Sequence, residues 1–199
     1  MPIRTIITAV GGVLIHFDYS RFFRFLALAL ETHDERVVAL WTGRGPDALL
    51  YRFSRGDLDL PGLWEGFRKQ FGVLLSGDEH AFRVFWLAGS QGLMPDTYRL
   101  LGATRRRHGL RLVSCTNTDS IFGEELRGPG EALHGFFAAE VQSWQVRAMK
   151  PEHAMYERAL AVAEAGPGEC LFIDDAHQNV RAAERLGIHG PHFTTAAAL

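Results

Sequence analysis

The sequence predicts an α/β protein: a doubly wound, Rossmann-like parallel sheet with an all-helical subdomain inserted after its first strand. Three observations predict this fold class. Residues 4–15 contain a short apolar run typical of a buried strand, residues 16–92 repeat apolar side chains at helical spacing, and residues 93–199 alternate strand and helix patterns. We therefore expect a core formed by residues 1–15 and 93–199, and a helical cap formed by residues 16–92.

The first strand is where a site is expected. Ile6, Ile7 and Val10 are β-branched and nearly continuous, which suits a strand buried on both faces of a parallel sheet. Gly11 and Gly12 follow; the pair allows a sharp turn and would leave its amides and carbonyls open to a ligand. Ligands of such sheets bind outside the carboxyl ends of the strands. Chemistry is therefore expected just after residue 8.

The next segment, to about residue 92, reads as a series of helices with no strand between them. Ser20 is a candidate N-cap for the first helix. Glycine and proline punctuate the segment at Gly43–Pro46, Gly56, Pro61-Gly62 and Gly72–Gly77. The apolar positions of the five expected helices are Phe22, Phe25, Leu26 and Ala29; Val37, Val38, Leu40 and Trp41; Leu49, Leu50 and Phe53; Leu63, Trp64 and Phe67; and Phe82, Phe85 and Trp86.

From residue 93 onward the pattern alternates. A helix is expected from Pro95 to the basic run Arg105–Arg107, whose charges complement the helix dipole. Two more helices are expected, ending at Gly166 and Gly187. The expected strands are 110–114, 136–141, 170–174 and a weaker one at 188–193, and the two later helices are 151–165 and 178–186. This alternation favours right-handed βαβ units.

Composition narrows the class of protein. The chain has 199 residues, 47% of them hydrophobic, which is enough for one core and a small subdomain. A net charge of −2 and a pI near 6.5 give no bulk attraction to nucleic acid or anionic membranes. No signal-peptide pattern and no membrane-spanning apolar run is seen, and Cys115 and Cys170 fall in expected buried strands, where they should stay reduced. A soluble cytoplasmic protein is expected.

Asp174 and Asp175 are the most specific chemical signal. They directly follow the expected strand Leu171–Ile173, where two adjacent carboxylates repel each other unless a cation or donors share them. Hard oxygen ligands of this kind suit Mg²⁺. The alternative is that Asp175 caps the helix that follows, which would explain only one of the two carboxylates.

Two further polar groups end strands or begin helices. Ser114 begins the run Ser114-Cys115-Thr116-Asn117 after the second core strand, although serine is also a common turn residue. Lys150 precedes Pro151, so its ammonium stands at a helix start, where it could stabilise charge on phosphoryl oxygens. The alternative for a single lysine is a solvated surface charge.

These groups, in this order, resemble the four motifs of the haloacid dehalogenase-like (HAD) hydrolases. Aligning Gly12-Val13-Leu14 with the first motif places the family's nucleophilic aspartate at Ala9 and its acid/base residue at Gly11. Ser114, Lys150 and Asp174-Asp175 resemble the second, third and fourth motifs, and Cys115 stands where the family often has asparagine. The resemblance is closest to the branch with a small helical cap that includes α-glucose-1-phosphate phosphatase and the phosphatase domain of epoxide hydrolases; Ser54–Leu58 resembles a turn of that cap.

The resemblance implies a phosphomonoester phosphatase acting on a small phosphorylated metabolite. Phosphate would be bound by Gly12, Ser114, Cys115 and Lys150. Mg²⁺ would be bound by the Gly11 carbonyl, Asp174 and Asp175, more weakly because the ligand at Ala9 is missing. A methyl group cannot attack phosphorus, so activity is expected to be weak or absent.

Three interpretations remain open. The first is a HAD-type phosphatase crippled at Ala9. The second is a non-catalytic module that binds a phosphorylated ligand or a protein partner, with Trp41, Trp64 and Trp86 as a possible partner surface, although a helical core explains these tryptophans better. The third is an enzyme in which Thr8, Cys115 or Asp18 replaces the nucleophile.

Overall fold

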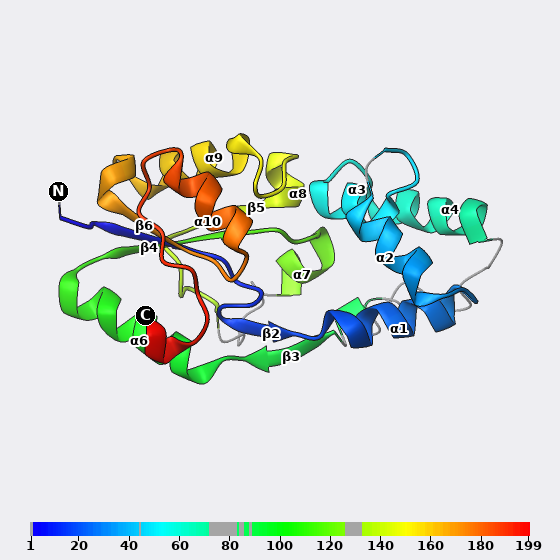
Figure 1. Cartoon of the computed structure of the whole chain (residues 1–199), viewed down its shortest axis with the longest axis horizontal. Coiled ribbons are helices and arrows are strands. Elements are labelled where there is room, and N and C mark those ends of the chain that lie inside the picture. Colours follow the sequence, from blue (N-terminus) through cyan, green and yellow to red (C-terminus); the bar gives the residue numbers. More distant parts are fainter. Residues whose placement is uncertain (1, 44, 72–82, 84–85, 88, 126–132) are drawn as a thin grey trace.

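The computed structural model describes residues 2–43, 45–71, 83, 86–87, 89–125 and 133–199 (Figure 1). Its centre is a four-stranded sheet in the order β5-β4-β1-β6, and every neighbouring pair is parallel. The predicted doubly wound α/β class is confirmed. The four strands are β1 (Thr5–Thr8), β4 (Arg111–Thr116), β5 (Ala139–Gln142) and β6 (Cys170–Ile173).

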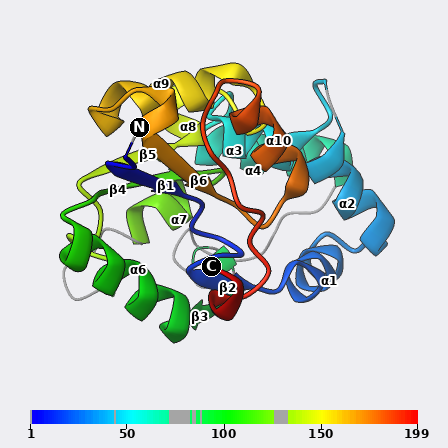
Figure 2. The ribbon, with the colours of Figure 1, turned by 60° about the vertical axis from the view of Figure 1, so that its left-hand side comes forward.

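Strand β1 is central because both of its edges are paired and all four of its residues are buried. Ile7 faces one apolar cluster, together with Phe172 and helix α9 (His153–Ala163). Ile6 faces the other cluster, together with Leu112 and helix α6 (Pro95–His108). Side chains alternate between the faces of a strand, so this β-branched run serves two cores at once. Helices α9 and α10 cover one face and α6 covers the other (Figure 2).

The helices and the remaining strands follow the chain in a regular order. The three core helices with predicted bounds, α6, α9 and α10, begin and end within one turn of those bounds. Their observed bounds are α1 (Tyr19–Ala29), α2 (Asp34–Thr42), α3 (Leu49–Arg55), α4 (Leu60–Phe71), α6 (Pro95–His108), α7 (Ser120–Glu125), α8 (Ser143–Val146), α9 (His153–Ala163) and α10 (His177–Glu184), with short 3₁₀ turns at Pro167–Glu169 and Ala196–Ala198; the other strands are β2 (Ile15–Phe17) and β3 (Ser90–Leu93).

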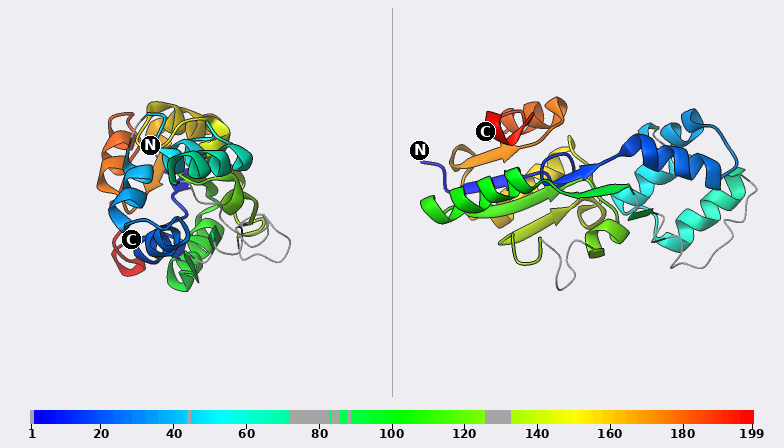
Figure 3. Two further views of the ribbon diagram at one scale, coloured as in Figure 1. Left: turned by 90° about the vertical axis from the view of Figure 1, so that its right-hand side faces the viewer. Right: turned by 90° about the horizontal axis from the view of Figure 1, so that it is seen from below.

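Helices α1 to α4 form a helical group at one end of the molecule, beyond the carboxyl ends of the sheet (Figure 3). The group has an apolar cluster of its own, in which Leu26, Leu63 and Phe67 are fully buried. Trp86 is buried in this cluster, and Trp41 and Trp64 pack against it. The tryptophans therefore belong to the helical core, as the preferred interpretation of the sequence had it.

The expectation that no strand occurs between residues 16 and 92 is wrong at both ends of that segment. Strands β2 and β3 pair antiparallel, with Ile15 opposite Leu93 and Phe17 opposite Ser90, and this ribbon joins the helical group to the sheet. Strands of three and four residues are too short to show a period of two. Their pairing partners are also far apart along the chain, so only the folded chain brings them together.

Several boundaries differ from the predictions. Helix α1 is capped by Asp18, whose carboxylate accepts a hydrogen bond from the Arg21 amide at 2.9 Å, and not by Ser20. Helix α9 ends at Ala163. Its C-cap, Glu164, takes the left-handed conformation, two residues before Gly166. The strand expected at 136–141 begins only at Ala139, because Phe136 turns into the core beside α6.

The weak strand expected at 188–193 is reduced to two isolated parallel bridges, at His189 and His192. Phe82, Phe85 and the break at Gly72–Gly77 lie outside the described residues. Among the helices that the structure describes, none is both long and apolar enough to cross a bilayer. Cys115 and Cys170 are both buried free thiols.

The end of α3 is fastened to the sheet side of the molecule. The Ser143 hydroxyl donates to the Ser54 carbonyl at 2.6 Å, and Tyr51 donates to a carboxylate oxygen of Glu152 at 3.1 Å. Gly56 caps α3 with a φ of 79°, and a β-carbon there would overlap the carbonyl oxygen of Trp144. This junction therefore depends on glycine at position 56 for two reasons, its left-handed φ and the close approach of α8.

Replacing Gly56 by alanine should destabilise the protein more than the same change at Gly109. Both glycines are left-handed helix caps, but a β-carbon at Gly109 meets nothing within 4 Å. Gly109→Ala should cost about 1–2 kcal/mol of unfolding free energy from the left-handed backbone alone. Gly56→Ala adds the clash with α8. Urea unfolding of both variants makes the comparison, and equal losses would contradict this account of the junction.

Candidate functional site

A buried ion pair lies at the carboxyl ends of the sheet. The Lys150 ammonium donates to Oδ2 of Asp174 at 2.6 Å, and the two side chains are only 3% and 1% exposed. Oδ1 of Asp174 accepts from the Ala176 amide at 2.8 Å and from Asn179 at 3.0 Å. Desolvating two charges is costly, so a pair like this persists only when hydrogen bonds satisfy the remaining groups, as they do here.

Asn117 aligns Lys150 through its backbone. The Asn117 side chain accepts from the Lys150 amide at 2.7 Å and donates to the Lys150 carbonyl at 3.0 Å. These two bonds tie the loop after β4 to the residue that carries the ammonium. Asn117 stands at the end of the predicted second motif, but the sequence suggested no role for it; only its closeness to Lys150 in the fold reveals one.

Asp175 faces the turn after β1. A β-carbon at Gly12 would overlap the Asp175 carboxylate, so glycine at this position, with its φ of 77°, leaves room for that group. Partial burial, and then the neighbouring charge of Asp174, raise the pKa of Asp175. The carbonyl of Asp175 lies 2.8 Å from Nε2 of His192. Asp175 does not cap the following helix, whose N-cap is Ala176.

Ala9 lies between these groups. Its amide donates to the Ile173 carbonyl at 2.8 Å, so it extends the β1–β6 ladder to the residue before Asp174. Ala9 is 3% exposed and belongs to the apolar cluster on the α6 side of the sheet. The Gly12 amide donates to the Ile15 carbonyl at 2.9 Å, which corrects the expectation that it stays open to a ligand.

Ser114 and Cys115 point in different directions. Ser114 pairs with Thr8 in the sheet, and its buried hydroxyl has no hydrogen-bond partner among the described residues. The Cys115 thiol contacts the Met155 carbonyl at 3.8 Å and packs in the cluster under α9. The structure therefore places Ser114 in the row of strand ends and buries the Cys115 thiol under α9, close enough to Lys150 and Asp174 for their charges to act on its pKa.

The three candidate replacement nucleophiles are all occupied elsewhere. The Thr8 hydroxyl is fully buried and donates to the Ala9 carbonyl at 2.9 Å. Burial raises the pKa of Cys115 to about 11, so the reactive thiolate is strongly disfavoured. Asp18 caps α1, and a hydrogen bond from the Arg21 backbone lowers its pKa. Nothing in these placements favours attack on a phosphate by any of the three.

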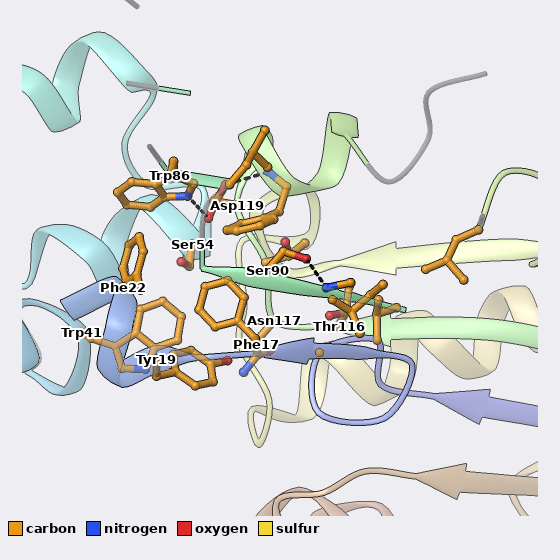
Figure 4. Close-up of a pocket in the computed structure, with 18 of the residues that line it drawn as sticks. Phe17, Tyr19, Phe22, Trp41, Ser54, Trp86, Ser90, Thr116, Asn117 and Asp119 are labelled. Atoms are coloured by element: carbon orange, nitrogen blue, oxygen red, sulfur yellow. Dashed lines mark hydrogen bonds between the residues drawn. The ribbon is translucent and has the colours of Figure 1, made fainter. Parts of the chain in front are cut away.

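A cavity of about 300 Å³ opens beside this site, between the strand ends and the helical group (Figure 4). Gly11 and the end of β4, Thr116 and Asn117, line one side of it. Aromatic side chains dominate the rest of the lining and come from β2, α1, α2 and the segments that follow; they include Phe17, Tyr19, Phe22, Trp41, Trp86 and Phe122. Periodicity in the sequence marks most of these residues as core and does not show that they enclose a space.

Asp119 is the acidic residue of the cavity lining. Its carboxylate accepts from the Trp86 indole at 2.9 Å and caps α7 through the amides of Ile121 and Phe122. Burial outweighs these donors and raises the pKa of Asp119 to about 6. The sequence analysis did not single out Asp119, because an aspartate before a helix reads as an ordinary cap.

A metal ion at the strand ends would need several oxygen donors close together. Among the described residues, no group of three or more histidine, cysteine or acidic side chains is arranged to hold an ion. The two oxygens of Asp174 are engaged by Lys150, Ala176 and Asn179, which leaves Asp175 as the available carboxylate. The Gly11 carbonyl stays a prediction as a ligand.

Breaking the ion pair should destabilise the fold in a non-additive way. Lys150→Met leaves Asp174 buried without its cation and should cost about 3–5 kcal/mol of unfolding free energy. The double variant Lys150→Met/Asp174→Asn should lose less than the sum of the two single losses. The exposed pair Lys69–Glu65, 3.4 Å apart, supplies the control, and its cycle should show almost no coupling. Additive losses at Lys150 and Asp174 would contradict the pairing.

The raised pKa of Asp119 predicts a pH-dependent stability. A carboxyl group whose pKa is higher in the folded state stabilises the fold below its ordinary pKa of 3.8, and that stability is lost as the pH rises through about 6. The wild type should therefore lose up to about 3 kcal/mol relative to Asp119→Asn between about pH 4 and pH 7. Urea unfolding of both proteins across this range tests it; parallel curves would be inconsistent with the shift.

Comparison with known proteins agrees with the fold. The family of haloacid dehalogenase-like hydrolases matches residues 10–187, a span that begins one residue after Ala9. Sesquiterpene phosphatase astK of Aspergillus oryzae is 27% identical over 152 residues, covering 74% of this chain and 73% of that protein.

Solved structures share the fold at low identity. A predicted HAD-like hydrolase from Porphyromonas gingivalis has a TM-score of 0.82 at 23% identity, covering 96% of this chain and 91% of that one. The HAD family enzyme bt-2542 from Bacteroides thetaiotaomicron has a TM-score of 0.81 at 20% identity, covering 96% and 93%. The family match spans most of the chain. The chain therefore belongs to the haloacid dehalogenase-like hydrolases.

Proposed function

We propose that this chain binds phosphomonoesters at the carboxyl ends of its sheet, as a phosphatase-type HAD scaffold whose hydrolytic step is weak or absent. The observation that carries the proposal is the buried Lys150–Asp174 pair at the strand ends, where the Ala9 amide binds the carbonyl of the residue before Asp174 and the Ala9 side chain is only a methyl group. The positive charge that would stabilise a phosphoryl group is fixed in place, while the position of the attacking carboxylate carries no nucleophile.

Three features support phosphate as the ligand. Asn117 and Asp174 hold the Lys150 ammonium in one place, so little reorganisation is needed when an anion arrives. The Ser114 hydroxyl is buried without a partner among the described residues, and a phosphoryl oxygen would supply one. The relative from Aspergillus oryzae is named a phosphatase.

The available donors fit Mg²⁺ bound jointly by protein and ligand. Mg²⁺ commonly keeps several waters and uses one or two carboxylates together with substrate phosphates. Asp175 is such a carboxylate, and the raised pKa that Asp174 and burial impose on it is what a nearby cation would relieve. Asp175 with the Gly11 carbonyl would hold the ion, which would neutralise phosphate charge. Without a carboxylate at residue 9, the affinity should be lower.

The hydrolytic step lacks two groups. An attacking carboxylate is absent at Ala9, and Gly11 has no side chain to protonate a leaving group. Water or a residue of the helical group would have to take the second role. We propose that residues 16–92, which include the helical group, act as a cap over residues 1–15 and 93–199. The cavity lies between the helical group and the strand ends, which supports this role.

A second candidate function is a non-catalytic module that senses a phosphorylated ligand, with a protein partner as its possible output. One observation favours it: Lys150 and Ser114, two of the proposed phosphate-binding residues, lie at the strand ends, while Ala9 supplies no nucleophile. The bt-2542 enzyme has been solved with magnesium and inorganic phosphate in a variant that has an aspartate replaced by alanine. Two buried free thiols suit a reducing compartment, and we place the protein in the cytoplasm.

Restoring the carboxylate should restore turnover. Ala9→Asp supplies both an attacking group and a metal ligand at the strand end, whereas Ala9→Asn matches it in size and cannot attack. We expect Mg²⁺-dependent hydrolysis of an aryl phosphate by Ala9→Asp, at least about tenfold above the wild type and above Ala9→Asn. An aryl leaving group needs little protonation, so the loss at Gly11 matters least there.

Initial rates with and without Mg²⁺ make the comparison. Robust Mg²⁺-dependent turnover by the wild type that disappears in Lys150→Ala would contradict the proposed loss of activity. Tighter Mg²⁺ binding by Ala9→Asp without any turnover would favour the non-catalytic module instead.

A further inference from the structure

The cavity beside the strand ends can be assigned to the organic part of the ligand, an inference that rests on the proposed phosphate site and extends it. About 300 Å³ lies at the small end of pockets that bind small molecules. Its lining is mainly aromatic and aliphatic, and none of the described residues that line it is a lysine or arginine. The walls therefore offer apolar contact area and little charge.

The side-chain amide and the carboxylate of the lining are occupied by the protein itself. Both ends of the Asn117 amide bind the backbone of Lys150. Both carboxylate oxygens of Asp119 accept hydrogen bonds, from Trp86 and from the start of α7. A sugar or another polyhydroxylated group would enter this space with several hydroxyls to satisfy, and burying such groups without partners is costly.

Ser54 contributes a buried hydroxyl that none of the described residues binds. Its hydroxyl is 1% exposed, it lines the cavity, and it has no hydrogen-bond partner among the described residues (Figure 4). Its carbonyl is bound by Ser143, which fixes the position of the residue at the end of α3. One buried hydroxyl without a partner can recognise one polar group on an otherwise apolar ligand.

Tyr19 connects the cavity to the carboxylates. Its ring stands in the lining, 4.6 Å from the ring of Phe17 between centroids, and 6.1 Å from that of Trp41. Desolvation of its hydroxyl, and then the charges of Asp175 and Asp174, raise the pKa of Tyr19 to about 12, although the residue as a whole is 48% exposed. Gly11 also lines the cavity and adjoins Gly12, which lies against Asp175, so a ligand at the strand ends borders the aromatic space.

We propose that this cavity binds the apolar hydrocarbon body of a phosphate monoester, with its phosphate at Lys150 and its chain against the aromatic wall of Trp41 and Phe22. The hydrophobic effect and aromatic contacts provide the binding energy of the chain. Selectivity against sugar phosphates arises because the lining is mainly apolar and its amide and carboxylate are already engaged by the protein.

Calorimetric titration of the full-length protein with Mg²⁺ tests the assignment with four probes: farnesyl monophosphate, farnesol, glucose 6-phosphate and inorganic phosphate. We expect farnesyl monophosphate to bind at least about tenfold more tightly than glucose 6-phosphate and inorganic phosphate. Farnesol should bind more weakly than its phosphate and should compete with it. Equal affinities for the farnesyl and glucose esters would overturn the proposal.

A matched pair of variants ties binding to the cavity. Trp41→Ala removes one aromatic wall, whereas Trp64→Ala removes the same bulk from the same helical cluster without touching the lining. Trp41→Ala should weaken farnesyl monophosphate about tenfold and leave inorganic phosphate unchanged, and Trp64→Ala should change neither. Equal effects of the two variants on farnesyl monophosphate would reject the aromatic wall as its site.

Ser54→Ala provides a second variant that should not disturb folding, because it removes a buried hydroxyl that has no partner. It should leave farnesol binding intact and weaken a farnesol analogue that carries one extra hydroxyl on its chain. An unchanged affinity for that analogue would remove Ser54 from the proposal.

The proposal and the phosphate site fail in different ways. If inorganic phosphate binds and depends on Lys150, but farnesyl monophosphate gains nothing over glucose 6-phosphate, the cavity assignment is wrong and the phosphate site stands. If farnesol binds and depends on Trp41 while phosphate does not bind, the cavity assignment stands and the phosphate site is wrong.

Discussion

The buried pair of Lys150 and Asp174 is the interaction on which the rest of the site depends. It joins the loop before α9 to the end of β6, and Asn117 adds the end of β4 through the backbone of Lys150. Removing either charge would leave the other buried without a partner, which typically costs about 3–5 kcal/mol of unfolding free energy. Three segments that are distant in sequence are therefore held around one point beside Ala9, whether or not the chain catalyses a reaction.

A buried ion pair of this kind adds little to the stability of the fold, but it fixes the position of the Lys150 ammonium. Replacing buried ion pairs by apolar residues is often neutral or even stabilising, so stability alone does not account for the choice of residues. A fixed ammonium beside a backbone turn is, in contrast, what binding of a phosphoryl group requires. In the function proposed above, the chain keeps the fixed ammonium of a phosphatase site and has alanine at the position of the reacting carboxylate. This combination favours ligand binding as the property that its present residues support.

The second constraint is the junction between the sheet and the helical group. Gly56 lets the end of α3 approach α8, and Ser143 and Glu152 bind α3 from the sheet side. Glu152 follows Lys150 by two residues, so the same short segment carries both the ammonium and an anchor for the helical group. The walls of the aromatic cavity are thereby positioned relative to the strand ends, and a ligand that spans them would contact both parts.

By itself, the sequence determined the fold class, the segments that form the core strands and the polar residues that follow those strands. Those features depend on local patterns: the β-branched run before Gly11, the helical spacing of apolar residues and the Asp174-Asp175 pair after a buried strand. Only the tertiary structure decided that Asp174 binds Lys150, that Asn117 hydrogen-bonds the Lys150 backbone, that the Cys115 thiol is buried under α9, and that β2 pairs with β3. It alone showed the cavity. Hydrogen bonds and enclosed spaces between distant segments depend on distances and directions in the folded chain, and a periodic pattern along the sequence encodes neither.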